Sequence, residues 1–554
     1  MHWSQIYSPI GHSAGWSALV ASLPILYFFW ALAIRRMKGH IAALTTVLLA
    51  IVDSVLVFHF PVGKAVSSTV FGMFTGLWPI GWIVFAAVFL YKITVKTGHF
   101  DVIRHSISGV TDDRRIQALL IAFAFGAFLE GAAGFGAPVA IAGAMLVGLG
   151  FKPIYAAGLC LIADTAPVAF GAIGIPITAL AGVTHTNPMF ISQVVGRQLP
   201  LMSLILPFWI VIVMAGWKGM KEVFPAVLTA GVSFATTQFL VSNYLGPQLP
   251  DVLSALVSLV SLIVLLRFWK PKTTFYFEHD ENALAAGQTA ATLAPGTTTM
   301  KLSGGAIFRS WSPFIVLTLM IILWTLPPVK ALLDHATMMF NWPNLNKEIM
   351  KVAPIASKPT ALAAVFKWDV LSATGTAIFI AAFITKFICG QSFSAWFKTL
   401  AETFKELRFP LLTIATVVGF GQLMNFSGMS ATMALALAST GVLFPFFAPL
   451  LGWIGVFLTG SDTSSNLLFG NLQQLTAQQL NLNPYLMLGA NSSGGVMGKM
   501  ISPQSIAVGA SATGLVGREG ELYRFTIKHS LIFLLIISII TVLQAYVVPG
   551  MIPS

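Results

Sequence analysis

Ten apolar runs, each close to the length that crosses a lipid bilayer, constrain this chain more than any other feature. The runs lie near residues 15–34, 41–60, 69–91, 200–216, 223–244, 249–266, 312–326, 371–390, 409–425 and 530–548. A helix of about 20 apolar residues spans the hydrocarbon core of a bilayer. Only 9% of the 554 residues are charged, whereas soluble domains carry about 25%. We therefore expect an all-α polytopic membrane protein.

Two further apolar regions, 116–185 and 432–515, are too long for one span and are interrupted by polar residues, glycine and proline. Each region has room for a re-entrant hairpin followed by a discontinuous helix. The chain holds 48 Gly and 29 Pro, more than straight spans need. Because proline kinks or breaks a helix, we expect broken helices in both regions.

The composition argues against several classes of protein. The net charge is +12, but Lys and Arg are spread over short loops, which makes nucleic acid a poor partner. The two cysteines, Cys160 and Cys389, lie in apolar surroundings and form neither a metal-ligand spacing nor a disulfide framework. We expect no metal and no cofactor. Residues 15–34 have no cleavage site and no preceding basic region, so we interpret them as a retained span.

Basic residues predict the orientation, because cytoplasmic loops carry an excess of Lys and Arg. Placing the basic loop 35–40 inside puts both termini in the periplasm. The stretch 271–310 is polar and rich in Gly, Thr and Ala, which is typical of a flexible linker. The other segments predicted to lie inside are 92–115, 217–222, 267–309, 391–408 and 517–528.

The two interrupted regions resemble each other, which indicates an internal repeat. The matched residues are Gly98 with Gly428, Phe128 with Phe457, Leu129 with Leu458, Gly131 with Gly460, Pro153 with Pro484, Gly158 with Gly489, Gly171 with Gly498, and Pro176 with Pro503. The spans that precede the two copies are predicted to run in opposite directions, so the copies are inverted. Inverted repeats with broken helices are the architecture of secondary transporters, which bind substrate near the midplane. Close helix packing alone would explain one such copy, but it explains two inverted copies poorly.

The spans and the repeat together predict seven segments. They are N-terminal transmembrane helices (1–68), a first inverted repeat (69–185), scaffold helices (186–270), a cytoplasmic linker (271–310), transmembrane helices with the external loop 327–370 (311–408), a second inverted repeat (409–515) and a C-terminal transmembrane helix (516–554). We expect the functional site where the two repeats meet.

Six charged residues fall at membrane depth in this arrangement, where a charge costs about 2.5–3.5 kcal/mol. They are Asp53, Glu130, Asp164, Lys386, Asp462 and Lys499. Glu130 lies in FLEGAAGFGAP (128–138), where Gly131 and Gly134 free the backbone at a helix break. A carboxylate there can carry a proton, or it can form an ion pair that pins the hairpin. We favour coupling to a proton or to substrate, and Asp164, at the second break of this region, is a further candidate.

A second polar stretch, TGSDTSSN (459–466), interrupts the other apolar region. Its Asp462 is another candidate proton carrier. Hydroxyl and amide groups beside the N-terminus of a half-helix can hold an anion. The alternative is an ordinary polar loop at the membrane surface. The candidate substrate-binding residues here are Thr459, Ser461, Thr463, Ser464 and Asn466.

The sequence NSSGG (491–495) predicts the break of the last discontinuous helix, with Asn491 and Ser492 as substrate-binding candidates. Lys499 follows. A cation at membrane depth needs a partner. Lys499 can pair with Glu130 or Asp462, or it can attract a carboxylate substrate directly.

Several long stretches resemble the bacterial lactate permease family, which includes lactate and glycolate permeases. They are FLEGAAGFGAPVAIAGA (128–144), GLCLIADTAPVAFGAIGIPI (158–177), FLTGSDTSSN (457–466), NSSGGVMGKMISPQSIAVGA (491–510), GLWPIGWIVFAAVFLYK (76–92) and GREGELYRFTIKHSLIF (517–533). The resemblance implies a symporter of the bacterial inner membrane that takes up L-lactate, D-lactate and glycolate with protons. It also implies kinship with transporters that move substrate by an elevator-like displacement of paired hairpins.

The resemblance includes one departure. Members of the family more often carry asparagine where this chain has Asp164, which implies that a negative charge there is not essential. We interpret the chain as a proton-coupled importer of small 2-hydroxy monocarboxylates, surrounded by membrane lipids, and keep a homodimer as a candidate assembly. Thr459 and Asn466 are the candidate partners of the 2-hydroxyl group.

Three alternatives remain open at this stage. Breaks rich in Ser, Thr and Asn can also ligate sodium, so a sodium-coupled carboxylate symporter is one. A proton-translocating subunit of a respiratory complex is another, since buried Lys and Glu on broken helices occur there as well. A membrane-embedded enzyme is the least favoured, because the sequence has no HExxH or GxSxG motif.

Overall fold

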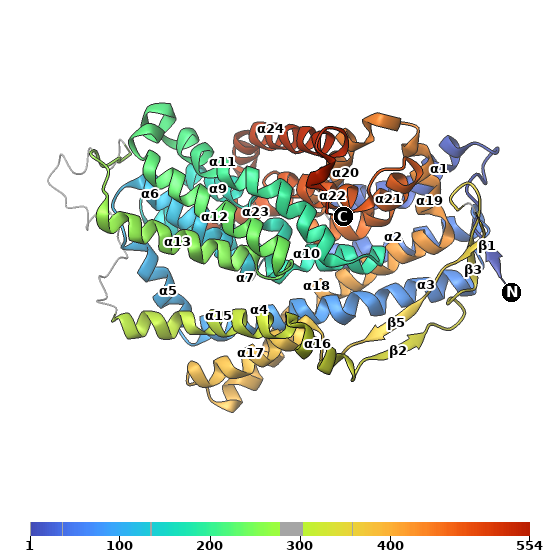
Figure 1. The fold of residues 1–554 in the computed structure, drawn as a ribbon, viewed down its shortest axis with the longest axis horizontal. Helices are drawn as coiled ribbons and strands as arrows, with labels where there is room; N and C mark the ends of the chain where they lie inside the picture. Colours follow the sequence, from blue (N-terminus) through green and yellow to red (C-terminus); the bar gives the residue numbers. More distant parts are fainter. Residues whose placement is uncertain are drawn as a thin grey trace.

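Helices make up nearly all of the structure, a computed structural model that describes residues 2–35, 37–132, 134, 136–277, 303–356 and 358–553 (Figure 1). Ten of the described helices are long and apolar enough to cross a membrane. A pair bent by 62°, Pro153–Ala163 with Val168–Thr184, makes an eleventh candidate. The prediction of an all-α, multi-span protein with a broken helix is confirmed. Most of the predicted linker 271–310 lies outside the described residues.

Most of the helices follow one another with short connections, except between α13 and α15 and between α16 and α17. The first half contains α1 (Ala14–Phe29), α2 (Gly39–Leu56), α3 (Val62–Thr75), α4 (Trp82–Lys96), α5 (His99–Ser108), α6 (Arg114–Ala118), α7 (Gly126–Ala132), α8 (Ala137–Gly148), α9 (Pro153–Ala163), α10 (Gly171–Thr184), α11 (Pro188–Glu222), α12 (Phe224–Tyr244) and α13 (Pro250–Phe268). The second half contains α15 (Gly304–Thr325), α16 (Pro327–Asp334), α17 (Thr374–Ile388), α18 (Phe393–Ser427), α19 (Met429–Ala438), α20 (Phe444–Thr459), α21 (Asp462–Gln479), α22 (Pro484–Lys499), α23 (Pro503–Thr513) and α24 (Glu519–Tyr546). The π-helical turn Gly76–Gly81 joins α3 to α4, and Leu119–Phe125 joins α6 to α7.

Three helical segments are each 35 residues long: Val62–Lys96, Pro188–Glu222 and Phe393–Ser427. At 1.5 Å per residue each measures about 52 Å, well beyond the roughly 30 Å of a hydrocarbon core. The prediction that 391–408 is a loop is therefore wrong, because α18 begins at Phe393. The charged residues that suggested a loop lie on the helix and form ion pairs, such as that of Lys96 with Glu402.

The first and third of these segments pack against each other in opposite directions. A Cβ atom on Gly72 would lie 2.6 Å from Cα of Gly419, and one on Gly76 would lie 2.8 Å from Cα of Ala415. Further along, Lys96 reaches Glu402. Residue numbers rise along one helix as they fall along the other, so the helices are antiparallel. Small residues allow this approach, as is usual between helices in membranes.

The elements that follow each of these two segments come in the same order. A glycine with positive φ (Gly98, 74°; Gly428, 87°) begins a helix of 10 residues, α5 or α19. A helical hairpin comes next, α6–α8 or α20–α21, and then a helix whose first residue is proline, α9 or α22. A further helix, α10 or α23, and a long helix, α11 or α24, complete the series. Two matched pairs do not coincide. Gly171 begins α10 whereas Gly498 lies near the end of α22, and Pro176 lies inside α10 whereas Pro503 begins α23.

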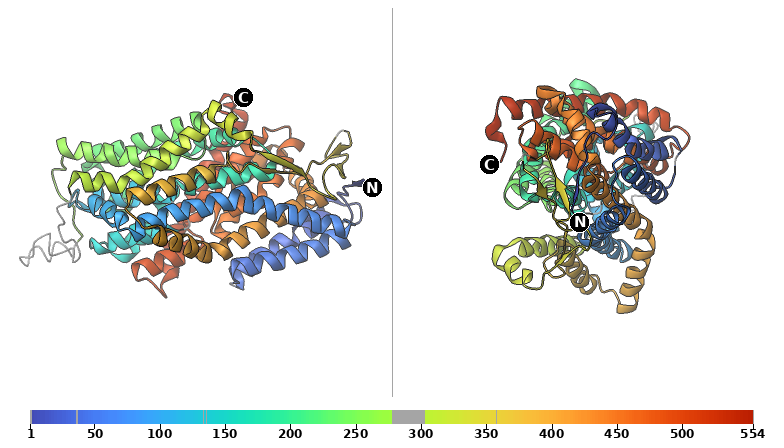
Figure 2. Two further views of the ribbon diagram at one scale, coloured as in Figure 1. Left: turned by 90° about the horizontal axis from the view of Figure 1, so that it is seen from below. Right: turned by 90° about the vertical axis from the view of Figure 1, so that its right-hand side faces the viewer.

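Five short strands form a small cap at one end of the helices (Figure 2). They are β1 (Trp3–Ser4), β2 (Met338–Asn341), β3 (Ile349–Lys351), β4 (Thr360–Ala361) and β5 (Val365–Trp368). β1 is parallel to β3, which pairs antiparallel with β4, and β2 pairs antiparallel with β5. The Gln5 side chain donates to the main-chain carbonyls of Asn425 and Phe426, which ties the N-terminus to the end of α18.

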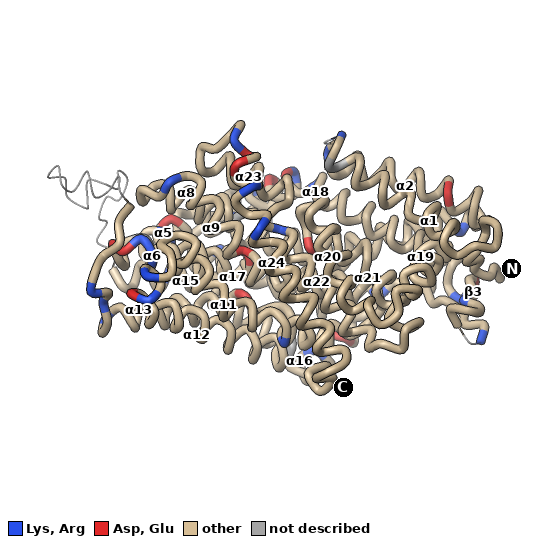
Figure 3. Tube along the Cα trace, turned by 90° about the horizontal axis from the view of Figure 1, so that it is seen from above, with Lys and Arg blue, Asp and Glu red and all other residues tan. Residues whose placement is uncertain are grey.

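The other end of the molecule carries many of the charged residues, around α5, α6 and α13 (Figure 3). Arg115, on α6 in the first hairpin, donates to the carbonyls of Gly219 and Thr273. Three segments predicted to lie inside therefore meet. The N-terminus and the loop 327–370, both predicted to lie outside, meet at the cap. The largest apolar core extends from α4 through α7–α13 to α24.

Candidate functional site

A cavity lies where four interruptions of the helices meet. Including its mouth, it encloses about 620 Å³. Its walls come from both hairpin turns, from the break between α9 and α10 and from the break between α22 and α23. The lining residues are Glu130, Gly134, Gly136, Val168, Gly171, Ala172, Ile175, Pro176, Gly460, Ser461, Asp462, Thr463, Lys499, Gln504, Ser505 and Val508.

The turn of the first hairpin brings Glu130 to the cavity. Glu130 lies in the last turn of α7, and the chain reverses through Gly134 and Gly136, whose φ angles of 61° and 83° favour glycine. The Glu130 side chain is only 4% exposed, and its Oε2 atom has no hydrogen-bond partner among the described residues. An unpaired buried carboxyl group is costly, so this geometry favours a neutral acid or a carboxylate close to a cation.

The break after α9 forms the adjoining wall. Ala172 and Ile173 both have positive φ, 44° and 62°. This conformation is strained for residues other than glycine, and especially for β-branched isoleucine. A Cβ atom on Gly134 would lie 2.9 Å from that of Ala172, so the strained segment contacts the hairpin turn. Asp164, just after α9, is 2% exposed but does not line the cavity.

The second hairpin turns at TGSDTSSN, as predicted. Helix α20 ends at Thr459, and Gly460 has a φ of 70°. The Ser461 hydroxyl caps α21 by accepting a hydrogen bond of 3.2 Å from the Ser464 amide. Asp462 is the first residue of α21. Gly460 contacts Gln504 of α23, much as Gly134 contacts Ala172 in the first copy.

A chain of buried side chains orients the Asp462 carboxylate. The Ser492 hydroxyl donates to Oδ2 of Asp462 at 2.6 Å, and the Asn466 amide donates to the same atom at 3.1 Å. Asn491 in turn donates to the Asn466 carbonyl oxygen at 2.9 Å, and Gln473 donates to Asn491 at 3.0 Å. Oδ1 of Asp462 has no partner in the described part of the chain. Two hydrogen bonds therefore fix Oδ2 of Asp462, whereas Oδ1 remains available to another group.

Lys499 supplies the cation of the cavity. It is the last residue of α22 and is 6% exposed. Across the described ranges its ammonium group makes no hydrogen bond and has no carboxylate within 4 Å. It interacts electrostatically, at longer range, with Glu130, Asp164 and Asp462. A buried ammonium group without a direct partner favours binding of an anion.

Helix N-termini add to this positive potential. Helices α8, α10, α21 and α23 all begin beside the cavity. The free N–H groups at each N-terminus favour negative charge. Ser502 caps α23 by accepting from the Ser505 amide at 3.1 Å. The cavity can thus bind a small anion beside two carboxyl groups that can carry a proton.

The structure places the predicted residues in two groups. Those in the cavity wall are Glu130, Gly134, Ser461, Asp462, Thr463 and Lys499. Those outside the wall are Gly131, Asp164, Thr459, Ser464, Asn466, Asn491 and Ser492. The Thr459 hydroxyl is engaged locally, donating to the Gly455 carbonyl at 2.7 Å.

The predicted break at residues 491–495 is wrong. These residues lie inside the continuous helix α22, which ends at Lys499, and the break follows at residues 500–502. The glycines serve packing instead. Cβ atoms on Gly494 and Gly452 would collide with the carbonyls of Pro449 and Asn491, so α20 and α22 touch backbone to backbone. Glycine allows this approach.

Sequence reasoning missed three polar residues. Gln504 and Ser505 line the cavity, and the sequence Ser502-Pro503 that precedes them is a helix-start signal. Asp251 is buried near the first hairpin. An aspartate after a proline at the start of a span is typical of an exposed helix cap. The sequence pattern therefore did not indicate that Asp251 lies near the cavity.

Comparisons with known proteins agree along the whole chain. A family model described as L-lactate permease matches residues 17–548. Glycolate permease GlcA of Escherichia coli (strain K12) is 55% identical over 564 residues, and L-lactate permease of Bacillus subtilis (strain 168) is 55% identical over 568. L-lactate permease of E. coli (strain K12) is 52% identical over 558 residues. All three alignments cover 100% of both chains.

Solved structures are more distant. The Alcanivorax borkumensis YdaH transporter is 14% identical, with a TM-score of 0.45 over 86% of this chain and 87% of that one. Neisseria gonorrhoeae MtrF is 11% identical, with a TM-score of 0.49 over 92% and 95%. At these scores the likeness is too weak to define the fold. The family model and the curated relatives are decisive: the chain belongs to the L-lactate permease family and is a multi-pass membrane transporter, not an enzyme.

Proposed function

We propose that this chain is a proton-coupled symporter that imports small 2-hydroxy monocarboxylates: L-lactate, D-lactate and glycolate. Relatives that are 52–55% identical over the full length are named L-lactate and glycolate permeases, which supports this substrate class. The observation that carries the proposal is the cavity at the four helix breaks. It brings Lys499 together with the carboxyl groups of Glu130 and Asp462, each of which has one oxygen without a hydrogen-bond partner among the described residues.

The architecture proposed here is a pair of inverted repeats that move substrate in an elevator-like way. The antiparallel pairing of α3–α4 with α18 and the shared order of the elements that follow support the inverted repeats. The two hairpins, α6–α8 and α20–α21, are the re-entrant elements of this arrangement. Such repeats place a site between them, at broken helices.

The substrate carboxylate binds at Lys499 and at the N-terminus of α21, with the hydroxyl groups of Ser461 and Thr463 close by. All three side chains line the cavity. The 2-hydroxyl group pairs with Gln504 or Ser505, which line the same cavity. Three buried residues lie behind the cavity wall, and their hydrogen bonds hold Asp462 in place. They are Asn466, Asn491 and Ser492.

The coupled proton is carried by Glu130 and Asp462. A bound carboxylate substrate neutralises Lys499, so the nearby carboxyl groups are then most stable when protonated. When substrate leaves, an ionised carboxylate can balance the lysine again. Uptake of one monoanion with one proton moves no net charge.

The chain is placed in the bacterial inner membrane with both termini in the periplasm. Support comes from the excess of Lys and Arg in the segments predicted to lie inside. Three of these segments meet around Arg115 at one end of the molecule. The β-strand cap, which includes the N-terminus, lies at the other end (Figure 3).

The test is uptake of labelled lactate by proteoliposomes, with and without an inward proton gradient. Accumulation that requires the gradient and is unchanged when choline replaces sodium supports the proposal. Equal accumulation without the gradient overturns proton coupling, and loss of uptake in choline identifies a sodium symporter instead. Glu130→Gln should abolish gradient-driven accumulation. Asp53→Asn is the matched control, because Asp53 is also a buried carboxyl group without a partner among the described residues, but it lies outside the cavity wall.

A further inference from the structure

Asp251 is a buried carboxyl group for which the proposed cycle has so far no role. It lies in the first turn of α13 and is 1% exposed. An aspartate there usually accepts hydrogen bonds from the free N–H groups of the helix. Neither oxygen of Asp251, however, has a partner in the ranges that the structure describes. The side chain therefore does not serve as a helix cap.

Asp251 packs directly beneath the first hairpin. A Cβ atom on Gly131 would lie 2.7 Å from Cβ of Asp251 and 3.0 Å from the amide nitrogen of Val252. Gly131 follows Glu130, the acid in the cavity wall. Because residue 131 has no side chain, the start of α13 can pack against it. Residue 131 is the sequence neighbour of Glu130, the proposed proton carrier.

The charged groups that face Asp251 come from two other elements. Glu130 on α7 and Asp164 after α9 both interact with it electrostatically. Lys499 on α22 interacts with those two acids and with Asp462. Four buried acids thus lie near this lysine, and like charges at membrane depth cannot all persist. Some of these acids are therefore protonated. The positive charge of Lys499 stabilises a negative charge on one of them, and this charge can pass from one acid to another.

We propose that Asp251 is a proton-relay residue that takes the coupled proton from Glu130, an inference that rests on the proposed proton symport. The Glu130 carboxylic acid gives its proton to the Asp251 carboxylate, which leaves Glu130 ionised towards Lys499 and Asp251 neutral. The proton that leaves Glu130 is the one that Asp251 gains, so the step balances, and it passes directly or through one bridging water. The N-terminus of α13 stabilises the anionic form of Asp251 and burial stabilises the neutral form, so neither form is locked.

The experiment compares two activities of reconstituted Asp251→Asn. Gradient-driven accumulation of lactate needs the proton to move, whereas counterflow exchange of labelled for unlabelled lactate does not. We expect accumulation to fall about 100-fold, the low end of what a positioned proton-transfer group contributes. Counterflow should persist, and its dependence on pH should flatten. Asp101→Asn is the matched control, an exposed aspartate in the first turn of α5.

If Asp251→Asn accumulates lactate normally while the wild-type protein responds to the gradient, the relay is overturned. The proposed function is unaffected by that result. Loss of counterflow together with accumulation shows a structural role and also overturns it. Wild-type protein that ignores the gradient overturns the proposed function itself. Should Asp251→Asn fail to reach the membrane, Asp251→Ser replaces it under the same criteria, since serine suits a helix N-terminus.

Discussion

A Cβ atom on Gly171 would lie 2.5 Å from Oε1 of Glu130, so the start of α10 and the acid of the first hairpin share one confined space. A small residue in one interruption thereby sets the position of a carboxyl group in another. Neither interruption could form this wall of the cavity alone.

Gly171→Ala should therefore displace Glu130 and reduce gradient-driven lactate uptake by about tenfold or more, since small displacements at a reacting centre can cost 100-fold. Membrane levels of the protein should change little. Gly182→Ala on the same helix is the matched control, because a Cβ atom there would have no neighbour within 4 Å in the described part of the chain. Initial uptake rates in proteoliposomes check the comparison, and similar rates for the two variants would contradict it.

Ser492→Ala should remove the shorter of the two hydrogen bonds to Asp462. A hydrogen bond to a charged group contributes about 1.5–3 kcal/mol, so we expect at least a tenfold change in kcat/KM for lactate. The neighbouring Ser493→Ala is the control, because the Ser493 hydroxyl is buried without a partner among the described residues. Kinetics of uptake over a range of lactate concentrations distinguish the two. A larger effect for Ser493→Ala would show that Ser492 does not orient Asp462.

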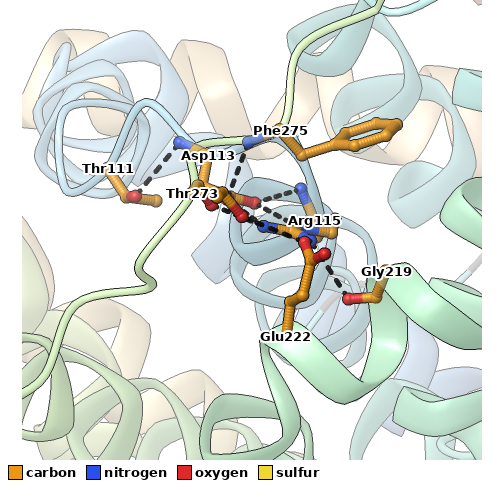
Figure 4. Close-up of polar contacts among 7 residues, drawn as sticks. All are labelled: Thr111, Asp113, Arg115, Gly219, Glu222, Thr273 and Phe275. Atoms are coloured by element: carbon orange, nitrogen blue, oxygen red, sulfur yellow. Dashed lines mark hydrogen bonds and ion pairs between the residues drawn. The ribbon is translucent and has the colours of Figure 1, made fainter.

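Arg115→Met should destabilise the protein. The guanidinium group, fully buried, donates to Asp113, Glu222 and the carbonyls of Gly219 and Thr273 (Figure 4). Removing one partner of a buried ion pair costs about 3–5 kcal/mol. Unfolding in detergent, followed by tryptophan fluorescence, should show a much lower midpoint. Arg518→Ala removes an exposed pair with Glu521 and should leave the midpoint almost unchanged; equal shifts would refute the assignment.

The β-strand cap should loosen in acid. A hydrogen bond from Lys64 lowers the pKa of Glu348, which precedes β3. Because the folded-state pKa is depressed, the stabilisation is complete above the ordinary glutamate value of about 4.3 and is lost as the pH falls through the lower value. Amide hydrogen exchange in residues 338–368, corrected for intrinsic rates, should rise in that window. Glu348→Gln should show no such rise, and a rise of equal size in that variant would contradict the prediction.

Local composition was sufficient to predict eight of the ten described helices that can span a membrane and the two hairpin turns. The predicted spans 15–34 and 371–390 form the shorter helices α1 and α17 instead. Apolar runs must form helices in a bilayer, since every backbone polar group needs a partner there. FLEGAAGFGAP and TGSDTSSN contain the residues that end helices, and both segments do turn. The same kind of evidence failed at residues 491–495, because Gly494 fits against Pro449 of another helix. No local signal distinguishes a glycine that breaks a helix from one that packs against a neighbour.

Asp251 is a second case in which the local sequence does not predict a contact between helices. Its sequence context is that of a helix cap, yet Gly131, 120 residues earlier in the chain, brings it beneath the first hairpin. The sequence by itself determined the membrane environment and the residues at which the hairpins turn, because these follow from hydrophobicity and backbone freedom within short stretches. Only the tertiary structure decided which polar groups share the cavity and which lie behind it. That depends on close contacts between helices that are far apart along the chain.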